Sequence, residues 1–227
     1  MPLDISRIQA LCFDVDGTLH DTDDQFVLKL AGWLRPLRFL LPNRDPLPLA
    51  RKLVMLTETP ATFLYAGPDW LGLDDEMAKL GDWIYRRGLR KSAHPYKLVE
   101  GVKELLAALQ PHYPLSVVTA RGERTTLHFL EHFGIRQYFS VIATGQTCRH
   151  TKPHPDPVLW AAEQMRTPAA SCLMIGDTTV DMLAGKAAGA QTVGVLCGFG
   201  TRGELERNGA DLVIDSTNLL AKILLAE

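Results

Sequence analysis

Two aspartates directly follow an apolar run near the beginning of the sequence. The stretch "LCFDVDGTL" (11–19) places Asp14 and Asp16 two positions apart and continues with Gly17. Because side chains alternate along an extended segment, Asp14 and Asp16 are expected on the same side. A carboxylate in the first position can act as a nucleophile, and one in the second can donate and accept a proton. Gly17 would let the chain turn sharply there.

Further polar residues follow other apolar runs. Thr119 lies at the end of the apolar part of "LSVVTA" (115–120), Asp177 ends "SCLMIGD" (171–177), and Lys152 lies in the loop after "SVIATG" (140–145). Acids that gather at one place repel one another unless they share a cation, and carboxylate oxygens suit Mg²⁺. Magnesium in turn points to phosphoryl chemistry, which needs a nucleophile, positive charge and hydrogen-bond donors around the phosphoryl oxygens.

The elements that must position these residues alternate between strands and helices. Short apolar segments predict buried strands at 8–15, 115–120, 140–145, 171–177 and 191–197, with an edge strand at 212–215. Apolar residues at spacings of three and four predict helices at 97–110, 124–134, 156–166 and 180–190. Two of these helices end at Gly134 and Gly189, as a left-handed C-terminal residue favours. "GFGTRGE" (198–204) is interpreted as a turn leading to a helix.

This alternation predicts an α/β fold, Rossmann-like, with a mostly parallel sheet and helices on both faces. In such sheets, ligands gather beyond the carboxyl ends of the strands, so the polar residues described above are expected to converge at one edge. The stretch 20–95 breaks the rhythm because it is rich in proline and has helix-like pieces around 25–40, 49–57 and 74–88. We expect a core domain of residues 1–19 and 96–227 and an inserted α-helical cap of residues 20–95.

At this point four ordered motifs resemble those of the haloacid dehalogenase superfamily. They are "DVDGT" (14–18), Thr119 in "VVTA", "KPHPDP" (152–157) and "GDTTVD" (176–181). The central region resembles the phosphoglycolate-phosphatase-like branch, which has a helical cap after the first motif. The resemblance covers roughly the whole core and leaves the cap poorly matched, with its proline-rich piece (36–48) departing from the pattern of the branch.

The resemblance implies a role for each matching residue. Asp14 would be the nucleophile and a Mg²⁺ ligand, and Asp16 the acid/base, with its backbone carbonyl on the metal. Thr119 would bind a phosphoryl oxygen, Lys152 would neutralise the nucleophile and the phosphate, and Asp177 would bind Mg²⁺ directly. Asp181 would orient metal-bound water or Lys152. The backbone amides of Thr18 and Ala120 would complete the phosphate cradle.

Composition limits the classes of protein that fit. The 227 residues carry a formal net charge of −2, which provides no global field for a nucleic acid or an anionic membrane. No apolar run approaches the roughly 18 residues of a membrane span, and the four cysteines are scattered without a CxxC pair. We therefore expect a soluble cytoplasmic protein with reduced, buried thiols. Its partner would be a small phosphorylated metabolite, and its oligomeric state is left open.

Three functions agree with these residues to different degrees. The favoured one is a Mg²⁺-dependent phosphatase that acts on a phosphoglycolate-like phosphomonoester through an aspartyl phosphate. A sugar-phosphate mutase of the β-phosphoglucomutase type would use the same intermediate, and a catalytically silent binding protein would keep only the fold. A dehalogenase is disfavoured, because that chemistry in the family dispenses with the second aspartate, whereas Asp16 is present.

Other polar residues are weaker candidates. His128 and His132 lie four apart on one predicted helix, where surface or packing roles are expected. Basic residues gather in the insertion, and a solvated helix face explains them about as well as a substrate clamp does. Among them, Arg35 and Arg38 are the first to test.

Overall fold

The computed structural model describes residues 3–21, 31–40, 45–46, 49–50 and 96–225. The chain divides into two compact units, one of residues 1–22 and 97–227 and the other of residues 23–96. In the second unit, residues 31–34 are helical and continue into the 3₁₀ helix η2 (Arg35–Leu40), and residues 49–50 are helical. The rest of the predicted helical pieces at 25–40 and 49–57, and all of the piece at 74–88, lie outside the described residues.

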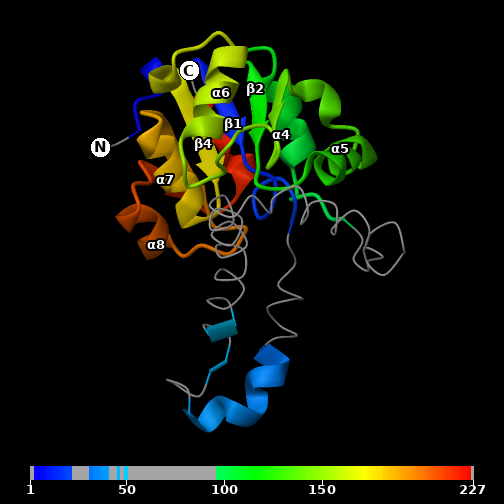
Figure 1. Cartoon of the computed structure of the whole chain (residues 1–227), viewed down its shortest axis with the longest axis vertical. Helices are drawn as coiled ribbons and strands as arrows, with labels where there is room; N and C mark the ends of the chain where they lie inside the picture. Colours follow the sequence, from blue (N-terminus) through cyan, green and yellow to red (C-terminus); the bar gives the residue numbers. More distant parts are fainter. Residues whose placement is uncertain (1–2, 22–30, 41–44, 47–48, 51–95, 226–227) are drawn as a thin grey trace. The chain divides into compact units, whose positions relative to one another are not determined.

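A six-stranded parallel sheet forms the centre of the first unit (Figure 1). Its spatial order is β3-β2-β1-β4-β5-β6, and every neighbouring pair is parallel. The predicted α/β fold with a parallel sheet is therefore confirmed, including the strand near residue 212. The strands are β1 (Ala10–Phe13), β2 (Leu115–Val118), β3 (Val141–Ala143), β4 (Cys172–Gly176), β5 (Gln191–Val195) and β6 (Leu212–Ile214).

The first strand lies at the middle of the sheet, between β2 and β4. Phe13, its last residue, is in register with Val117 on one side and Ile175 on the other. All four residues of β1 are buried, because a parallel sheet is covered on both faces and its central strands contact no water. Strands β2 and β3 follow on one side of β1, and β4, β5 and β6 follow on the other side. The carboxyl ends of β1, β2 and β4 therefore lie together at the point where the strand order changes direction.

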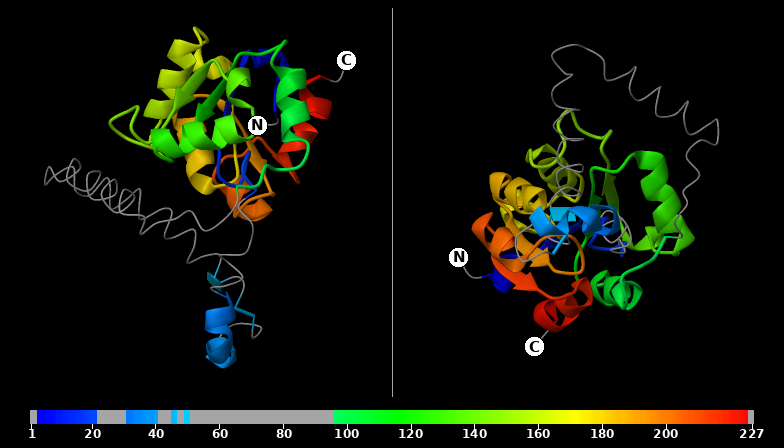
Figure 2. Two further views of the ribbon diagram at one scale, coloured as in Figure 1. Left: turned by 90° about the vertical axis from the view of Figure 1, so that its right-hand side faces the viewer. Right: turned by 90° about the horizontal axis from the view of Figure 1, so that it is seen from below.

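Helices cover both faces of this sheet. Those of the first unit are α4 (Val102–Leu109), α5 (Glu123–His132), α6 (Asp156–Gln164), α7 (Thr179–Ala187), α8 (Arg202–Arg207) and α9 (Leu220–Leu224). Helices α6 and α7 pack over one face, and α4 and α9 lie side by side on the opposite face (Figure 2). Within the described ranges, every helix is too short or too polar to cross a bilayer.

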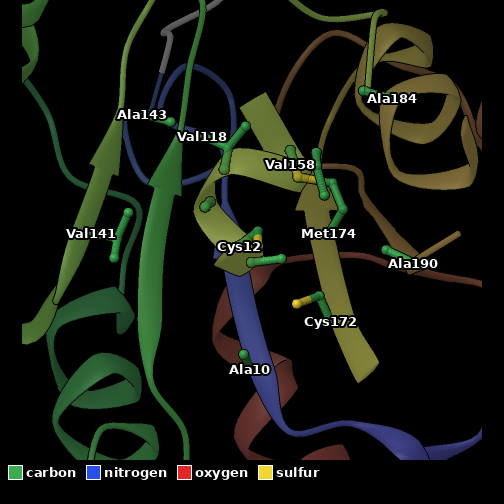
Figure 3. Close-up of a cluster of buried hydrophobic side chains, with 12 residues drawn as sticks. Ala10, Cys12, Val118, Val141, Ala143, Val158, Cys172, Met174, Ala184 and Ala190 are labelled. Atoms are coloured by element: carbon green, nitrogen blue, oxygen red, sulfur yellow. The ribbon is translucent and has the colours of Figure 1, made fainter. Parts of the chain in front are cut away.

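Small side chains let α6 and α7 approach the sheet closely. The hydrophobic cluster between these two helices and the sheet contains Ala10, Cys12 and Ala143 from the strands (Figure 3). Ala161 and Ala184 contribute to it from the helices. Close packing of such side chains holds the strand ends in fixed positions. All four cysteines are free thiols, and two of them, Cys12 and Cys172, are buried here on neighbouring strands.

The helix predicted at 97–110 begins later than its apolar pattern indicated. Residues 97–99 instead pair with the segment after β1, where Asp21 donates its N–H to the Lys97 carbonyl and Val99 donates to Leu19. Gly101, at φ +76°, then turns the chain into α4. The two predicted left-handed glycines after helices are confirmed, with φ +59° at Gly134 and φ +81° at Gly189.

Candidate active site

Three neighbouring strands deliver the predicted polar residues to one edge of the sheet. Asp14 directly follows β1, Thr119 follows β2, and Asp177 follows β4. All three side chains are buried, with at most 7% of each residue exposed. The backbone is fixed as well, because Asp14 N–H bonds to the Ile175 carbonyl and Thr119 N–H to the Ala143 carbonyl. Residues more than 160 positions apart in sequence are thus placed at one edge, as predicted.

Lys152 extends from the loop between β3 and α6 into the carboxylates. Its Nζ lies 2.8 Å from Asp14 Oδ1 and 2.5 Å from Asp181 Oδ1, and the side chain is buried. Burial lowers the pKa of a lysine, but the charges and hydrogen bonds of Asp14 and Asp181 outweigh it and raise the pKa of Lys152 well above its ordinary value. The ammonium therefore stays protonated beside Asp14.

Asp181 is positioned by the first turn of α7. Thr178 is the N-cap of this helix, and its backbone N–H and hydroxyl both donate to Asp181 Oδ2, at 3.0 and 2.6 Å. This reciprocal capping box satisfies donors that a helix N-terminus otherwise leaves open. One oxygen of Asp181 is thus committed to the helix and the other to Lys152. Such a residue is suited to orient Lys152, the role predicted for it.

Asp177 is enclosed by two glycine-containing turns. The Phe199 N–H donates to Asp177 Oδ2 at 2.8 Å, and Phe199 belongs to the turn that leads into α8, as predicted for "GFGTRGE". On the other side, Gly17 adopts φ +70°, and a Cβ at that position would overlap the Asp177 carboxylate. Glycine is therefore required at 17 for two reasons, its backbone conformation and the close approach of Asp177.

Three buried carboxylates and a buried ammonium gather at the site. Carboxylate oxygens of Asp14, Asp177 and Asp181 all lie within 4.8 Å of one another, and among the described residues the ammonium of Lys152 contacts two of these carboxylates. Burial raises the pKa of Asp14 to about 7, helped by repulsion from Asp181 and Asp16 and opposed by Lys152. Such a cluster of hard carboxylate oxygens fits a divalent cation such as Mg²⁺.

Asp16 has partners that the sequence did not single out. Arg121 Nε donates to its Oδ2 at 3.0 Å and Nη2 contacts Oδ1, while His20 Nδ1 lies 3.1 Å from Oδ1. Burial would raise the pKa of Asp16, but the hydrogen bonds and charges of His20 and Arg121 outweigh it and lower the pKa to about 2. The only sequence signals for these partners are the spacing of four from Asp16 to His20 and the position of Arg121 just after the predicted Thr119 and Ala120.

The predicted phosphate-binding residues differ in their surroundings. Thr18 is fully buried, and its hydroxyl has no hydrogen-bond partner among the described residues. The Thr119 hydroxyl accepts the Arg121 N–H at 3.1 Å, and Ala120 is exposed. A buried hydroxyl without a partner is costly unless a ligand satisfies it. The Thr18 N–H donates to the Val15 carbonyl at 3.3 Å, so the amide predicted for the phosphate cradle already has a backbone partner.

The weaker candidates lie away from these carboxylates or in the second unit. His128 and His132 are exposed on α5 with stacked rings 6.3 Å apart, which agrees with the surface role expected for them. Arg35 and Arg38 are exposed on η2. The remaining basic residues of the insertion are largely outside the described part of the chain.

Comparison with known proteins gives a consistent match over almost the whole chain. A family model described as "Haloacid dehalogenase-like hydrolase" matches residues 11–195. The chain is 34% identical to a phosphoglycolate phosphatase of Photobacterium profundum over 96% of each chain. It is 31% identical to a phosphoglycolate phosphatase of Neisseria gonorrhoeae, covering 86% of this chain and 83% of that one.

A solved structure shares both fold and sequence. The crystal structure of a hydrolase from Pseudomonas syringae aligns with a TM-score of 0.67 and 26% identity, over 96% of this chain and 99% of that one. The predicted family resemblance is thus confirmed, and so is the predicted enzyme class, a phosphatase-type hydrolase, at the level of the family and its relatives.

Proposed function

The chain belongs to the haloacid dehalogenase-like hydrolase family, and from this premise we propose that it is a Mg²⁺-dependent phosphatase acting on a small phosphomonoester. One observation carries the proposal: Lys152 bridges Asp14 and Asp181 beside Asp177, at the edge where three parallel strands end. The similarity to phosphoglycolate phosphatases over 96% of the chain supports a small, anionic substrate of the phosphoglycolate kind.

In this proposal Asp14 is the nucleophile. Its carboxylate attacks phosphorus, an Asp14 oxygen–phosphorus bond forms, and the bond from phosphorus to the alcohol oxygen breaks. Lys152, 2.8 Å from Asp14 Oδ1, lowers the pKa of this carboxylate against the effect of burial and neutralises the incoming phosphoryl oxygens. The Thr119 hydroxyl and the Ala120 amide hold those oxygens in place. Asp181 fixes Lys152 from the other side.

Asp16 is the general acid and the general base. It protonates the departing alcohol, then removes a proton from the water that attacks the aspartyl phosphate, which releases inorganic phosphate and restores Asp14. Arg121 and His20 hold Asp16 as a carboxylate, with a pKa of about 2. Proton delivery therefore requires that the contact with Arg121 loosens, and the anionic oxygens of a substrate compete for that guanidinium.

The residues suited to hold Mg²⁺ are Asp14, Asp177 and the backbone carbonyl of Asp16. When bound, Mg²⁺ would neutralise the phosphoryl oxygens and the repelling carboxylates. This donor set fits because the side chain of Asp16 is directed to Arg121, while those of Asp14 and Asp177 share one buried cluster. We further propose that residues 20–95 act as a cap that selects the substrate and excludes water.

A phosphate-release assay on the full chain with Mg²⁺ tests the proposal. The panel contains phosphoglycolate, other small phosphomonoesters and sugar phosphates, and Asp14→Asn is compared with the matched control Asp215→Asn, an exposed acid next to Arg202. We expect Asp14→Asn to lose at least about a thousandfold in rate and Asp215→Asn to keep it.

Three outcomes would contradict the proposal. Unchanged phosphate release by Asp14→Asn would place the chemistry elsewhere. Interconversion of sugar phosphates without phosphate release would make the protein a mutase. Absence of turnover over the whole panel, with the protein folded, would leave a binding protein of this fold.

A further inference from the structure

A second cluster of ligand-type side chains lies outside the carboxylate site. It consists of His150 and His154, in the loop between β3 and α6, and Asp156, the first residue of α6. His150 Nδ1 lies 2.9 Å from Asp156 Oδ2, and His154 Nδ1 lies 2.8 Å from Asp156 Oδ1. The two imidazole rings are 4.4 Å apart. The Nδ1 atoms of both histidines thus contact the single carboxylate of Asp156.

We propose that His150, His154 and Asp156 form a binding site for a divalent transition-metal ion of the zinc class. Both Nδ1 atoms lie next to the Asp156 carboxylate. A single cation bound by these three groups can replace the protons that the two rings would otherwise donate to this carboxylate. Four-coordinate zinc holds nitrogen and oxygen ligands at about 2.0–2.2 Å, which separates neighbouring ligand atoms by about 3.4 Å. The two Nδ1 atoms contact different oxygens of Asp156, and one ligand atom from each of the three residues lies within 4.8 Å of the other two, so a small adjustment would bring them around one ion.

The donor set separates this site from the Asp14 site by chemistry. Two imidazole nitrogens and one carboxylate oxygen favour zinc or its neighbours in the transition series, whereas the all-oxygen set around Asp14 favours magnesium. Access also favours binding, because the side chains of His150, His154 and Asp156 are 39%, 49% and 33% exposed. An ion can enter from solvent, and a water molecule can fill a fourth position.

The site has a structural consequence for Lys152. His150 and His154 flank Lys152 in the loop, and Lys152 Nζ extends to Asp14 and Asp181. An ion held by both histidines and by Asp156 would tie the two sides of this loop to the start of α6. Occupancy of the site is therefore expected to raise the melting temperature of the protein.

Zinc binding by the full chain tests the proposal. Zn²⁺ is titrated against a chromophoric chelator in the presence of excess Mg²⁺, which occupies the Asp14 site. We expect one tight Zn²⁺ per chain, and a loss of affinity of more than about a hundredfold in the His150→Ala/His154→Ala variant. The matched control is His128→Ala/His132→Ala, which removes an exposed pair with the same spacing on α5 and is expected to bind as the wild type does.

Two further measurements distinguish loss of the site from unfolding of the protein and from zinc bound at another site. Asp156→Asn keeps the shape of the side chain and is expected to weaken binding, and Co²⁺ loaded in place of Zn²⁺ is expected to show an absorption spectrum with histidine ligands. Equal zinc binding by wild type and His150→Ala/His154→Ala would overturn the proposal. So would zinc binding that is lost in Asp177→Asn or in the α5 control, or a cobalt spectrum without histidine ligation.

Discussion

Arg121 grips Asp16 at two points, with Nε donating to Oδ2 at 3.0 Å and Nη2 contacting Oδ1. The two residues lie 105 positions apart in sequence. Together with His20, this contact lowers the pKa of Asp16 to about 2, below the ordinary value of 3.8. Because the folded pKa is depressed, the contact contributes stability above about pH 4, and this contribution is lost as the pH falls from about 4 towards 2.

Arg121→Ala tests this contact. We expect the variant to lose about 1 kcal/mol of unfolding free energy at pH 7, and the loss should be smaller at pH 3, where Asp16 of the unfolded chain is protonated. Urea unfolding at the two pH values measures both differences. The exposed Arg207→Ala is the control and should change little at either pH. A loss that grows on acidification would contradict the assignment.

Asp14→Asn is expected to change the pH dependence of stability in the absence of metal. The pKa of Asp14 is raised to about 7, so the folded state keeps a proton that the unfolded state releases near pH 4. Stability contributed by this group therefore falls as the pH rises from about 4 to about 7. The free energy of unfolding is measured with EDTA present for Asp14→Asn and for the wild type. The value for the variant minus that for the wild type should be at least about 1 kcal/mol larger at pH 8 than at pH 4.5. A difference of the opposite sign would show that ionised Asp14 is stabilised in the fold.

Lys152→Met is expected to be strongly destabilising. It leaves Asp14 and Asp181 buried without the ammonium that now contacts both. Removing one partner of a buried ion pair costs about 3–5 kcal/mol. Lys97→Met is the matched control, because its 2.6 Å pair with Asp21 is exposed to solvent and such pairs contribute less than about 1 kcal/mol. Chemical unfolding at pH 7 measures both variants, and equal losses would argue against a buried charge cluster.

Gly17→Ala is expected to abolish the stabilisation by Mg²⁺. Its Cβ would overlap the Asp177 carboxylate, and φ at this position is +70°. Gly189→Ala is the control for backbone strain, because φ is +81° there and no heavy atom lies within 4 Å of the added Cβ. Both variants should lose about 1 kcal/mol from strain. Only Gly17→Ala should also lose the rise in melting temperature with Mg²⁺, which corresponds to about 2.7 kcal/mol at a concentration of 100 times Kd.

Most of the core elements could be predicted because their signals are local. Each strand is a short apolar run bounded by polar residues. The start of α7 is marked by Thr178 and Asp181, whose spacing of three is typical of a capping box. The error at 97–101 has a non-local cause, since an apolar spacing of three to four does not reveal that Val99 bonds to Leu19, 80 positions away. The predicted cap and the roles of the site residues remain proposals.

The partners of the site residues were harder to predict. Arg121 looks like an ordinary loop residue, and His150 and His154 look like solvated histidines, until the fold brings each to a carboxylate. The contact of Arg121 with Asp16 exists because β2 is the neighbour of β1 in the sheet. No spacing along the chain encodes that neighbourhood.

The sequence by itself determined which residues end strands and which types of chemistry they offer, because both follow from local hydrophobicity and from side-chain functional groups. Only the tertiary structure decided the strand order β3-β2-β1-β4-β5-β6, the position of Lys152 between Asp14 and Asp181, and the hold of Arg121 on Asp16. The physical reason is that charges interact over a few ångströms, and such distances between remote residues are set by the packing of the helices and the pairing of the strands.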